Sequence, residues 1–179
     1  MEWKLRTITP DDAPILAQIY TYYIRNTVAT FHEVPKTTDA YRRQIEELSA
    51  VYPFLVAEAD GLFLGFANAE PFRPQSGYRY TAELTIYLHP DAPKHAGIGR
   101  RLYESILERL RQMHYVNALA CISGENAASI AFHRSLGFEE MAVFPRVAYK
   151  HGRWLDAIWM RKTLLSTETQ PQEPIRMKD

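Results

Sequence analysis

The sequence predicts a single α/β domain in which a mixed sheet of about seven strands carries helices on both faces. Three observations predict it. The length of 179 residues suits one domain with a sizeable core. The composition, 46% hydrophobic and 12% aromatic, is that of a globular chain. Segments with the periodicity of strands and of helices alternate along the chain as far as residue 165.

The N-terminal half is expected to hold strands at 3–8, 54–58, 62–69 and 79–89, with helices ending near residue 21 and covering 40–48. Thr9 to Asp12 and Thr37 to Asp39 supply the capping residues of these two helices. Asp60-Gly61, between two strands, is a strong hairpin signal. The segment 20–31 is rich in aromatic and β-branched residues, and we expect it to loop over a pocket.

The C-terminal half is expected to hold helices at 98–113 and 125–135 and strands at 116–122, 138–147 and 153–162. One apolar stripe runs along the first of these helices, formed by Ile98, Leu102, Ile106, Leu110 and Met113. Gly137 is a helix C-cap, and His151-Gly152 turns the last pair of strands. Residues 166–179 are polar, contain proline and lack an apolar period, so we expect a disordered tail after a domain of residues 1–165.

Charge and cysteine content exclude several classes. Lys plus Arg equals Asp plus Glu at 21 each, so no net field attracts nucleic acid or an anionic membrane. The single cysteine, Cys121, excludes an internal disulfide and suits a reducing compartment. The N-terminus lacks the apolar stretch of a signal peptide and no segment is long enough to span a bilayer, so we expect a cytoplasmic protein. His89, His95 and His114 are scattered, and no metal is expected.

The most informative stretch runs from Lys94 to Arg101, between an apolar strand and an amphipathic helix. Gly97 and Gly99 let the backbone approach a ligand, and the helix N-terminus presents unpaired N–H groups and a positive dipole end. These features predict a cradle for a pyrophosphate. A P-loop would need Gly-Lys-Ser/Thr, and a dinucleotide fingerprint a third glycine and an earlier position. Structural glycines are the remaining alternative, although the two arginines that follow favour an anionic ligand.

At these residues the chain resembles the GCN5-related N-acetyltransferases (GNAT), which bind the pyrophosphate of acetyl-CoA with Arg/Gln-x-x-Gly-x-Gly/Ala between a strand and a helix. Residues 94–99 match this motif with Lys in the first position, and the turn at 89–93 is one residue longer than usual. The stretches 80–83, 129–138 and 149–156 resemble the phosphinothricin N-acetyltransferase branch. The resemblance covers about residues 5–164 and implies the GNAT fold, with a mixed and mostly antiparallel sheet.

The resemblance implies that acetyl-CoA contacts the end of a strand, the glycine loop and a later helix, through Tyr87, Leu88, His89, Lys94, His95, Ala96, Gly97, Ile98, Gly99, Arg100 and Asn126. A backbone N–H just after Tyr87 is the expected oxyanion donor, where the family's strand splays. Asn126 resembles the asparagine that holds the pantetheine arm, and it can cap its helix as well. Relatives of this branch are commonly homodimers, with which the apolar C-terminal hairpin is compatible.

The family reaction is direct attack of an amine on the thioester. An α-amino group is largely protonated at neutral pH, so a base must first remove a proton. Glu83 occupies the general-base position, and burial in its apolar strand would raise its pKa; an exposed edge-strand or ion-paired glutamate is the alternative. His133 stands where many relatives carry a tyrosine that protonates the CoA thiolate. It can instead assist Glu83, or be a helix-surface histidine.

The resemblance implies a small amino acid or analogue as substrate: phosphinothricin, methionine sulfoximine or methionine sulfone, and with them a role in herbicide or antibiotic resistance. Substrate choice is assigned to Phe31, Phe72, Arg73, Gln75, Tyr78, Thr85 and Tyr87. Arginine matches a carboxylate or phosphinate through two hydrogen bonds, whereas Gln75, where relatives often have a basic residue, lets a neutral sulfone or sulfoximine be read as readily. Acetylation of a polyamine or protein N-terminus, and a non-catalytic acetyl-CoA-binding module, are the alternatives.

Overall fold

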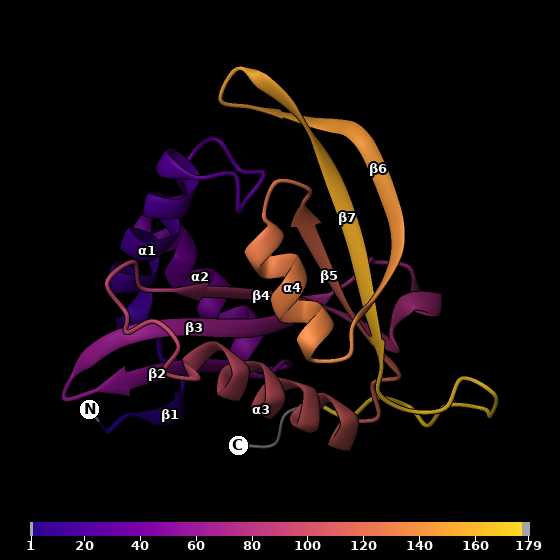
Figure 1. Ribbon diagram of the computed structural model, residues 1–179. Helices are drawn as coiled ribbons and strands as arrows, with labels where there is room; N and C mark the ends of the chain where they lie inside the picture. Colours follow the sequence, from indigo (N-terminus) through magenta and orange to yellow (C-terminus); the bar gives the residue numbers. More distant parts are fainter. Residues whose placement is uncertain (1, 177–179) are drawn as a thin grey trace.

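The computed structural model describes residues 2–176 and contains seven strands and four α-helices, arranged as predicted in a mixed sheet with helices on both faces (Figure 1). The strands are β1 (Lys4–Thr7), β2 (Phe54–Ala59), β3 (Leu62–Pro71), β4 (Thr81–Leu88), β5 (Asn117–Ser123), β6 (Glu139–Lys150) and β7 (Arg153–Thr163). The helices are α1 (Ala13–Asn26), α2 (Thr38–Ser49), α3 (Ile98–Gln112) and α4 (Ala127–Ser135), with short 3₁₀ turns at Pro10–Asp12 and Ser76–Tyr78.

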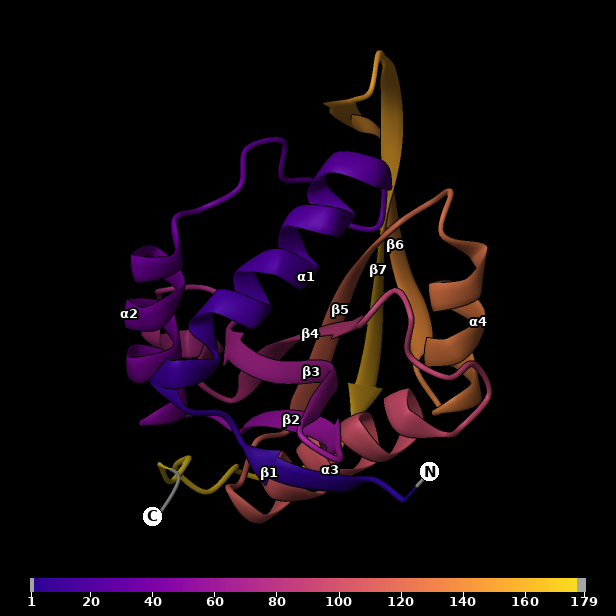
Figure 2. The ribbon, with the colours of Figure 1, turned by 90° about the vertical axis from the view of Figure 1, so that its left-hand side faces the viewer.

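The sheet has the order β1-β2-β3-β4-β5-β7-β6, and only the β4–β5 pair is parallel. Helices α1 and α2 pack on one face, and α3 and α4 on the other, which Figure 2 separates clearly. The β6–β7 hairpin extends beyond both helical layers (Figures 1 and 2). The parallel pair lies between two antiparallel halves, so the centre of the sheet is where β4 and β5 can separate.

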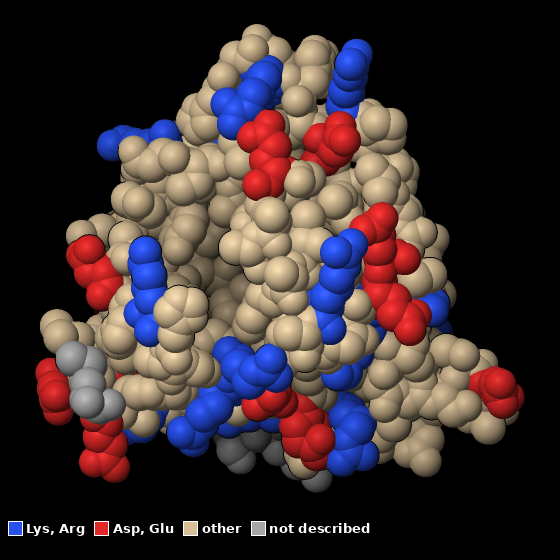
Figure 3. Space-filling view, in the orientation of Figure 1, with Lys and Arg blue, Asp and Glu red and all other residues tan. Residues whose placement is uncertain are grey.

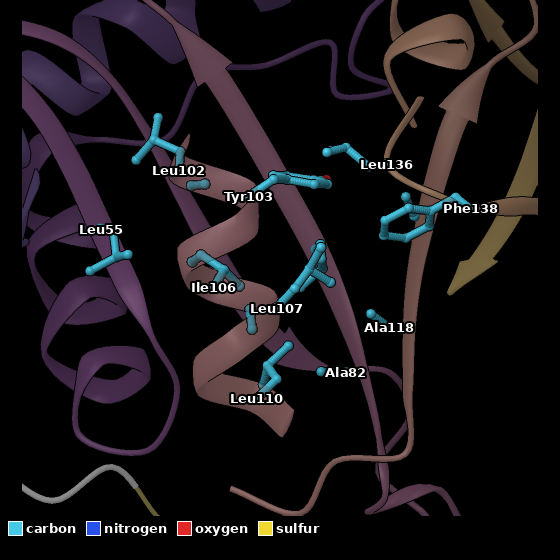
Figure 4. Close-up of a cluster of buried hydrophobic side chains, with 14 of the residues drawn as sticks. Leu55, Ala82, Leu102, Tyr103, Ile106, Leu107, Leu110, Ala118, Leu136 and Phe138 are labelled. Atoms are coloured by element: carbon cyan, nitrogen blue, oxygen red, sulfur yellow. The ribbon is translucent and has the colours of Figure 1, made fainter. Parts of the chain in front are cut away.

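The core below the sheet is built on the apolar stripe of α3. Leu102, Ile106 and Leu110 are fully buried against the sheet, where the small side chains of Ala82 and Ala118 leave room for them (Figure 4). Burial of this stripe supplies the hydrophobic stabilisation that fixes α3 under β4 and β5. The N-terminus of α3 is thereby held next to the point where these strands separate.

Both predicted hairpin turns have the backbone that their residues favour. Asp60 and Gly61 have φ of 49° and 78°, and His151 and Gly152 have φ of 49° and 77°. Two consecutive positive φ angles make the turn whose twist matches antiparallel strands. The register of β2 with β3 and of β6 with β7 is therefore set locally.

Helix α1 is longer than predicted, because it continues past residue 21 to Asn26. The expected loop over a pocket begins only at Thr27, where Ala29 reaches the larger cavity described below. Ile24 is buried, and the Tyr23 hydroxyl donates to the Leu88 carbonyl at 2.8 Å. Aromatic and β-branched residues have a weak helix propensity, and the prediction therefore ended the helix too early. Tertiary burial of these residues outweighs that propensity.

After β7 the chain forms no further helix or strand as far as Arg176, and residues 177–179 of the expected tail lie outside the described part. Glu173 nevertheless accepts hydrogen bonds from Arg79 at 2.6 and 2.8 Å and from the Tyr80 hydroxyl at 2.8 Å. The division into a domain of residues 1–165 and a tail stays a prediction. Over residues 2–176, no helix combines the length and apolarity that crossing a membrane requires.

Candidate active site

The central strands open into a V. β4 and β5 pair only from Thr81–Glu83 to Asn117–Leu119 and then diverge. A cavity of about 780 Å³ occupies the opening, between the second half of β4, the loop before α3, and α4. It corresponds to the hollowed face in Figure 3, where Lys and Arg side chains gather below the hollow, over α3. A volume of this size is in the range of sites for cofactor-sized ligands.

One wall of this cavity is the glycine loop, since all residues from Lys94 to Arg100 line it. Gly97 has φ of 76° and directly precedes α3, whose first backbone bond runs from the Arg101 N–H to the Gly97 carbonyl. The N–H groups of residues 98–100 therefore have no partner within the helix. Together with the positive end of the helix dipole they face the cavity, which is the arrangement that binds phosphate.

Glycine occurs at the two positions of the loop for different physical reasons. The positive φ at Gly97 is a conformation that other residues adopt only with strain. At Gly99 a β-carbon would meet Ile86 and Phe132 at 3.5 and 3.7 Å, which is ordinary contact. Protein packing therefore does not require glycine at 99. Since Gly99 also lines the cavity, this favours a ligand over the purely structural explanation of the motif.

The backbone of β4 offers an oxyanion donor. The His89 N–H donates to the Leu64 carbonyl of β3 at 2.8 Å. Since successive residues of a strand point their N–H groups to opposite edges, the Leu88 N–H points away from β3, into the gap left by β5. Gly65 of β3 approaches closely here, because a β-carbon on it would lie 2.7 Å from the Leu88 side chain. The expected donor just after Tyr87 is thus Leu88.

Glu83 lies on β4 at the last residue that still pairs with β5. Burial, and secondly the negative charge of Glu70, raise the pKa of Glu83 to about 7, while Arg73 acts in the opposite direction. β4 is an interior strand, and Glu83 makes no salt bridge within residues 2–176. Neither alternative explanation, an edge-strand or an ion-paired glutamate, describes this residue.

His133 of α4 is buried, with 2% of its surface exposed, so it is not a helix-surface histidine. Its Nδ1 atom lies 2.8 Å from the Ser129 carbonyl and its Nε2 atom 2.9 Å from the Tyr103 hydroxyl. A carbonyl can only accept, so Nδ1 carries the proton and the Tyr103 hydroxyl donates to Nε2. Burial lowers the pKa of His133 and favours this neutral form. Both residues line the larger cavity.

Asn126 both caps α4 and lines the cavity. Its Oδ1 atom accepts a hydrogen bond from the Ser129 N–H at 3.1 Å. The amide group of the cap remains beside the cavity as a donor. Both predicted uses of Asn126 are therefore compatible in space.

The predicted substrate residues do not form one group. Thr85 and Tyr87 line the larger cavity, but Phe31, Phe72, Arg73, Gln75 and Tyr78 do not. Phe72 packs on Tyr78 and Trp159 at 5.4 and 5.5 Å between ring centres, and the Arg73 guanidinium lies 4.4 Å from the Phe72 ring. Gln75 and Tyr78 are exposed. This aromatic cluster contacts β7 through Trp159.

Sequence reasoning missed Tyr103, Cys121 and Tyr23, which all line the larger cavity. Tyr103 is next to Leu102 of the apolar stripe of α3, so the sequence pattern indicated a core residue there and not a site residue. Burial raises the pKa of the Cys121 thiol to about 12, helped by the charge of Glu83, so it stays protonated. Among the described residues no group of three metal-ligating side chains occurs.

Comparisons with known proteins agree with this geometry. Residues 5–159 match the family described as "Acetyltransferase (GNAT) domain". The chain is 36% identical over 167 residues to a phosphinothricin N-acetyltransferase of Alcaligenes faecalis, covering 92% of this chain and 84% of that protein. It is 35% identical over 154 residues to an L-methionine sulfoximine/L-methionine sulfone acetyltransferase of Salmonella typhimurium, covering 86% and 90% of the two chains.

Two solved structures have the same fold. A phosphinothricin acetyltransferase from Sinorhizobium meliloti in complex with acetyl-CoA is 34% identical, with a TM-score of 0.91 over 97% of this chain and 95% of that one. A ribosomal-protein-alanine N-acetyltransferase from Brucella melitensis is 38% identical, with a TM-score of 0.85 over 89% and 99% of the two chains. The fold predicted from the sequence is confirmed, and so is the family that the glycine loop indicated.

Proposed function

Because the chain belongs to the GNAT acetyltransferases, we propose that it transfers the acetyl group of acetyl-CoA to the α-amino group of a small amino acid or analogue. Phosphinothricin, methionine sulfoximine and methionine sulfone are the proposed substrate class. One observation carries the proposal: Glu83, a carboxyl with a pKa of about 7, lies where β4 and β5 diverge, directly before Leu84, the first residue of β4 that lines the cavity of the glycine loop. A base with this pKa suits deprotonation of an ammonium at neutral pH.

Acetyl-CoA fits the residues that line the larger cavity. The amides of residues 98–100 and the basic Lys94 and Arg100 would hold the pyrophosphate. The amide of Asn126 would bind the pantetheine arm. The Leu88 N–H would donate to the thioester oxygen, on which negative charge develops during attack. Bound acetyl-CoA supplies the activated acyl group, and the remaining chemistry belongs to protein side chains.

The proton balance requires two transfers. Glu83 takes the first proton from the substrate ammonium and later releases it to solvent, and the free amine attacks the carbonyl carbon. The nitrogen loses its second proton as the C–N bond forms, and the leaving sulfur needs one as the C–S bond breaks. We assign this second proton to the Tyr103–His133 pair: Tyr103 accepts it while passing its own to Nε2 of His133, and the pair returns a proton to sulfur.

The test is a thiol-release assay with the purified protein and acetyl-CoA, run side by side with phosphinothricin, methionine sulfoximine, methionine sulfone and spermidine. We expect turnover with one or more of the three amino-acid analogues and none with spermidine. Turnover with spermidine alone would assign the polyamine alternative, and bound acetyl-CoA without turnover would leave a binding module.

Acetylation of a protein N-terminus is the second candidate, because the Brucella melitensis relative at 38% identity is a ribosomal-protein-alanine N-acetyltransferase. A peptide with an N-terminal alanine separates the two candidates when added to the same assay. We favour the small amino acid because Arg73, close enough to Glu83 to lower its pKa, offers a partner for a substrate carboxylate. A peptide lacks a carboxylate at that distance from its amine.

We also propose a homodimer, with the β6–β7 hairpin as its contact. Val147 and Trp154 are 56% and 59% exposed, and they lie on a hairpin that projects from the molecule (Figure 1). Apolar side chains exposed along an edge strand are typical of an interface. Light scattering should give twice the mass of the chain, and Val147→Lys together with Trp154→Lys should give the single-chain mass; a monomeric parent protein would refute the dimer.

Two further points belong to this proposal. Acetylation removes the free amine of a toxic analogue, so cells that express the protein should grow at phosphinothricin concentrations that stop control cells. A cytoplasmic location suits the free thiol of Cys121. Growth inhibition equal to that of cells carrying Glu83→Gln would argue against a resistance role.

A further inference from the structure

A second, smaller cavity of about 130 Å³ lies on the face of the sheet that α1 and α2 cover. Tyr20 of α1, Gln44 of α2, Glu70 of β3 and Thr85 of β4 are among its lining residues. Thr85 lines the larger cavity as well, so the two spaces adjoin at β4. None of the residues that the sequence assigned to the substrate lies in the smaller cavity, except Thr85.

The floor of this cavity holds polar side chains without protein partners. Asn68 is buried, with 4% of its surface exposed, and its carboxamide makes no hydrogen bond to any described residue. The side chains of Glu70 and Thr85 are likewise unbonded between residues 2 and 176. Glu70 and Thr85 are partly buried, whereas the Tyr41 hydroxyl, which also lines this cavity, is fully buried and has no partner among the described residues. Buried polar groups in folded proteins are nearly always paired, so an unpaired hydroxyl beside these unbonded side chains points to a ligand in the cavity.

The register of β3 and β4 makes these side chains one constellation. Asn68 pairs with Thr85, and Glu70 pairs with Glu83. Directly opposed residues of antiparallel strands point to the same face, with β-carbons about 5 Å apart. The carboxyl groups of Glu70 and Glu83 therefore stand side by side, one at the smaller cavity and the other at the proposed reaction centre.

The chemistry of this floor favours a ligand rich in hydrogen-bond donors. The carboxyl group of Glu70, the amide oxygen of Asn68 and the hydroxyl of Thr85 are acceptors in this floor, with the Glu83 carboxyl opposite Glu70, and a primary ammonium has three N–H donors to match them. The cation that lies nearest, Lys36, already donates to Gln44 at 3.0 Å. A volume of about 130 Å³ corresponds to about four water molecules, which suits one end of an amino acid and excludes a folded peptide.

Burial raises the pKa of Glu70, and the positive charge of Lys36 opposes the rise. The titratable groups around it are Tyr20 from α1, Tyr41 from α2, His32 and Lys36 from the segment between these helices, and Glu83 from β4. Glu83 is the one that feels Glu70 as a like charge. An ammonium placed between the two carboxyl groups would relieve this repulsion.

We propose that the floor of the smaller cavity seats the ammonium group of the acceptor, with Glu70 and Asn68 as binding residues opposite Glu83. This inference rests on the proposed function and adds to it a recognition site for the amine. The ammonium gives one proton to Glu83, while Glu70 stays ionised and holds the remaining N–H groups in place. Attack on the thioester then starts from an amine already fixed at the junction of the two cavities.

The experiment compares Glu70→Gln with the parent protein and with Glu47→Gln, which removes an exposed carboxylate of α2. In Glu70→Gln we expect the KM for methionine sulfone to rise about tenfold or more, the loss of one hydrogen bond to a charged group. The KM for acetyl-CoA should not change. In the pH profile of kcat/KM, the fall on the acidic side (the acidic limb) should move to lower pH, because Glu83 loses a like-charged neighbour and its pKa decreases. Asn68→Ala should raise the same KM without moving the limb.

An unchanged KM for the amine in Glu70→Gln, with an unmoved acidic limb, would overturn the inference. A binding readout keeps it separate from the proposed function. If the parent protein acetylates none of the amino acids, the side-chain amide signal of Asn68 is followed by NMR while methionine sulfone is added in the presence of CoA. A shift that Glu70→Gln abolishes supports the amine site even without turnover. No shift refutes it.

The alternative is that the smaller cavity holds the polar side chain of the substrate and not its ammonium group. The same NMR signal of Asn68 distinguishes these two occupants. Ethanolamine carries the ammonium and lacks the sulfone, whereas 3-(methylsulfonyl)propionate carries the sulfone and lacks the amine. A shift of Asn68 with ethanolamine supports the proposal. A shift with the sulfone acid alone would assign the cavity to the side chain and overturn it.

Discussion

The two cavities that meet at β4 differ in the groups that line them. One wall of the larger one presents backbone groups, namely the loop from Lys94 to Gly99, the first N–H groups of α3 and the Leu88 N–H. The floor of the smaller one is made of side chains that project from β3 and β4. In the proposed function, backbone groups would therefore provide much of the binding of acetyl-CoA, and side chains that can be exchanged one at a time would bind the acceptor.

This difference explains how a single fold can keep one cofactor and change its acceptor. Substitution of a side chain leaves backbone N–H groups where they are unless, as at Gly97, the backbone conformation itself requires glycine, so the glycine loop tolerates most changes that would alter the smaller cavity. The comparison predicts that changes on the acceptor side act on the amine and on proton transfer, that changes in the glycine loop act on acetyl-CoA alone, and that Tyr103, which lines the larger cavity, acts on proton transfer. Each of the following variants tests one side of that division.

Glu83→Gln should have the largest effect. Loss of a positioned base lowers kcat by about 10²–10⁴-fold. In the parent protein kcat/KM should fall as the pH drops below about 7, because the base is lost when Glu83 takes up a proton. Steady-state kinetics from pH 5 to 9 measure both. Turnover in the variant equal to that of the parent would remove Glu83 from the role of base.

Thermal unfolding is the control for this variant. The pKa of Glu83 is higher in the folded protein than its ordinary value of 4.5, so the folded state binds the proton more tightly. Stability from this group therefore declines as the pH rises from about 4.5 to 7 and is constant above. Glu83→Gln avoids that decline, so it should gain melting temperature over the parent at pH 8 and not at pH 4. A lost activity would then not reflect unfolding.

Tyr103→Phe should rank second, with kcat lower by up to about 100-fold and the KM for acetyl-CoA little changed, because a proton carrier is lost and not a binding group. The variant leaves Nε2 of His133 without its partner. Tyr115→Phe is the matched control, since it removes a hydroxyl from another buried tyrosine that does not line the cavity. A kcat within twofold of the parent would exclude Tyr103 from the second proton transfer.

Gly97→Ala tests the cofactor side. A residue with a β-carbon in this conformation costs about 1–2 kcal/mol, so acetyl-CoA should bind about tenfold more weakly if the loop relaxes to avoid the strain. Gly61→Ala carries similar strain, at φ of 78°, in a hairpin that does not line the cavity. Calorimetry should find weaker acetyl-CoA binding in the first variant only. Equal loss in both would mean that stability, not the loop, is responsible.

The same contrast marks what could be predicted from the sequence. The glycine loop, both hairpin turns and the α3 stripe depend on neighbouring residues, and all of them were predicted correctly. The end of α1 depends on burial against β4, and it was misplaced by five residues, from 21 to 26. Asn68 and Glu70 carry no local signal. They matter only because the register of β3 sets them opposite Thr85 and Glu83.

Arg73→Ala should have the smallest effect and divides the acceptor side further. Arg73 does not line either cavity, and its Nη1 atom donates to the Phe72 carbonyl at 2.8 Å. Its positive charge nevertheless lowers the pKa of Glu83, so its removal should move the acidic limb of kcat/KM to higher pH, opposite to Glu70→Gln. If Arg73 also binds the substrate carboxylate, the KM for the amine should rise about threefold to tenfold, and Arg73→Lys should restore the limb but not the KM. If the acidic limb of kcat/KM shifts while the KM for the amine stays normal, Arg73 acts only through its charge on Glu83. The acceptor would then be recognised by the side chains on the floor of the smaller cavity.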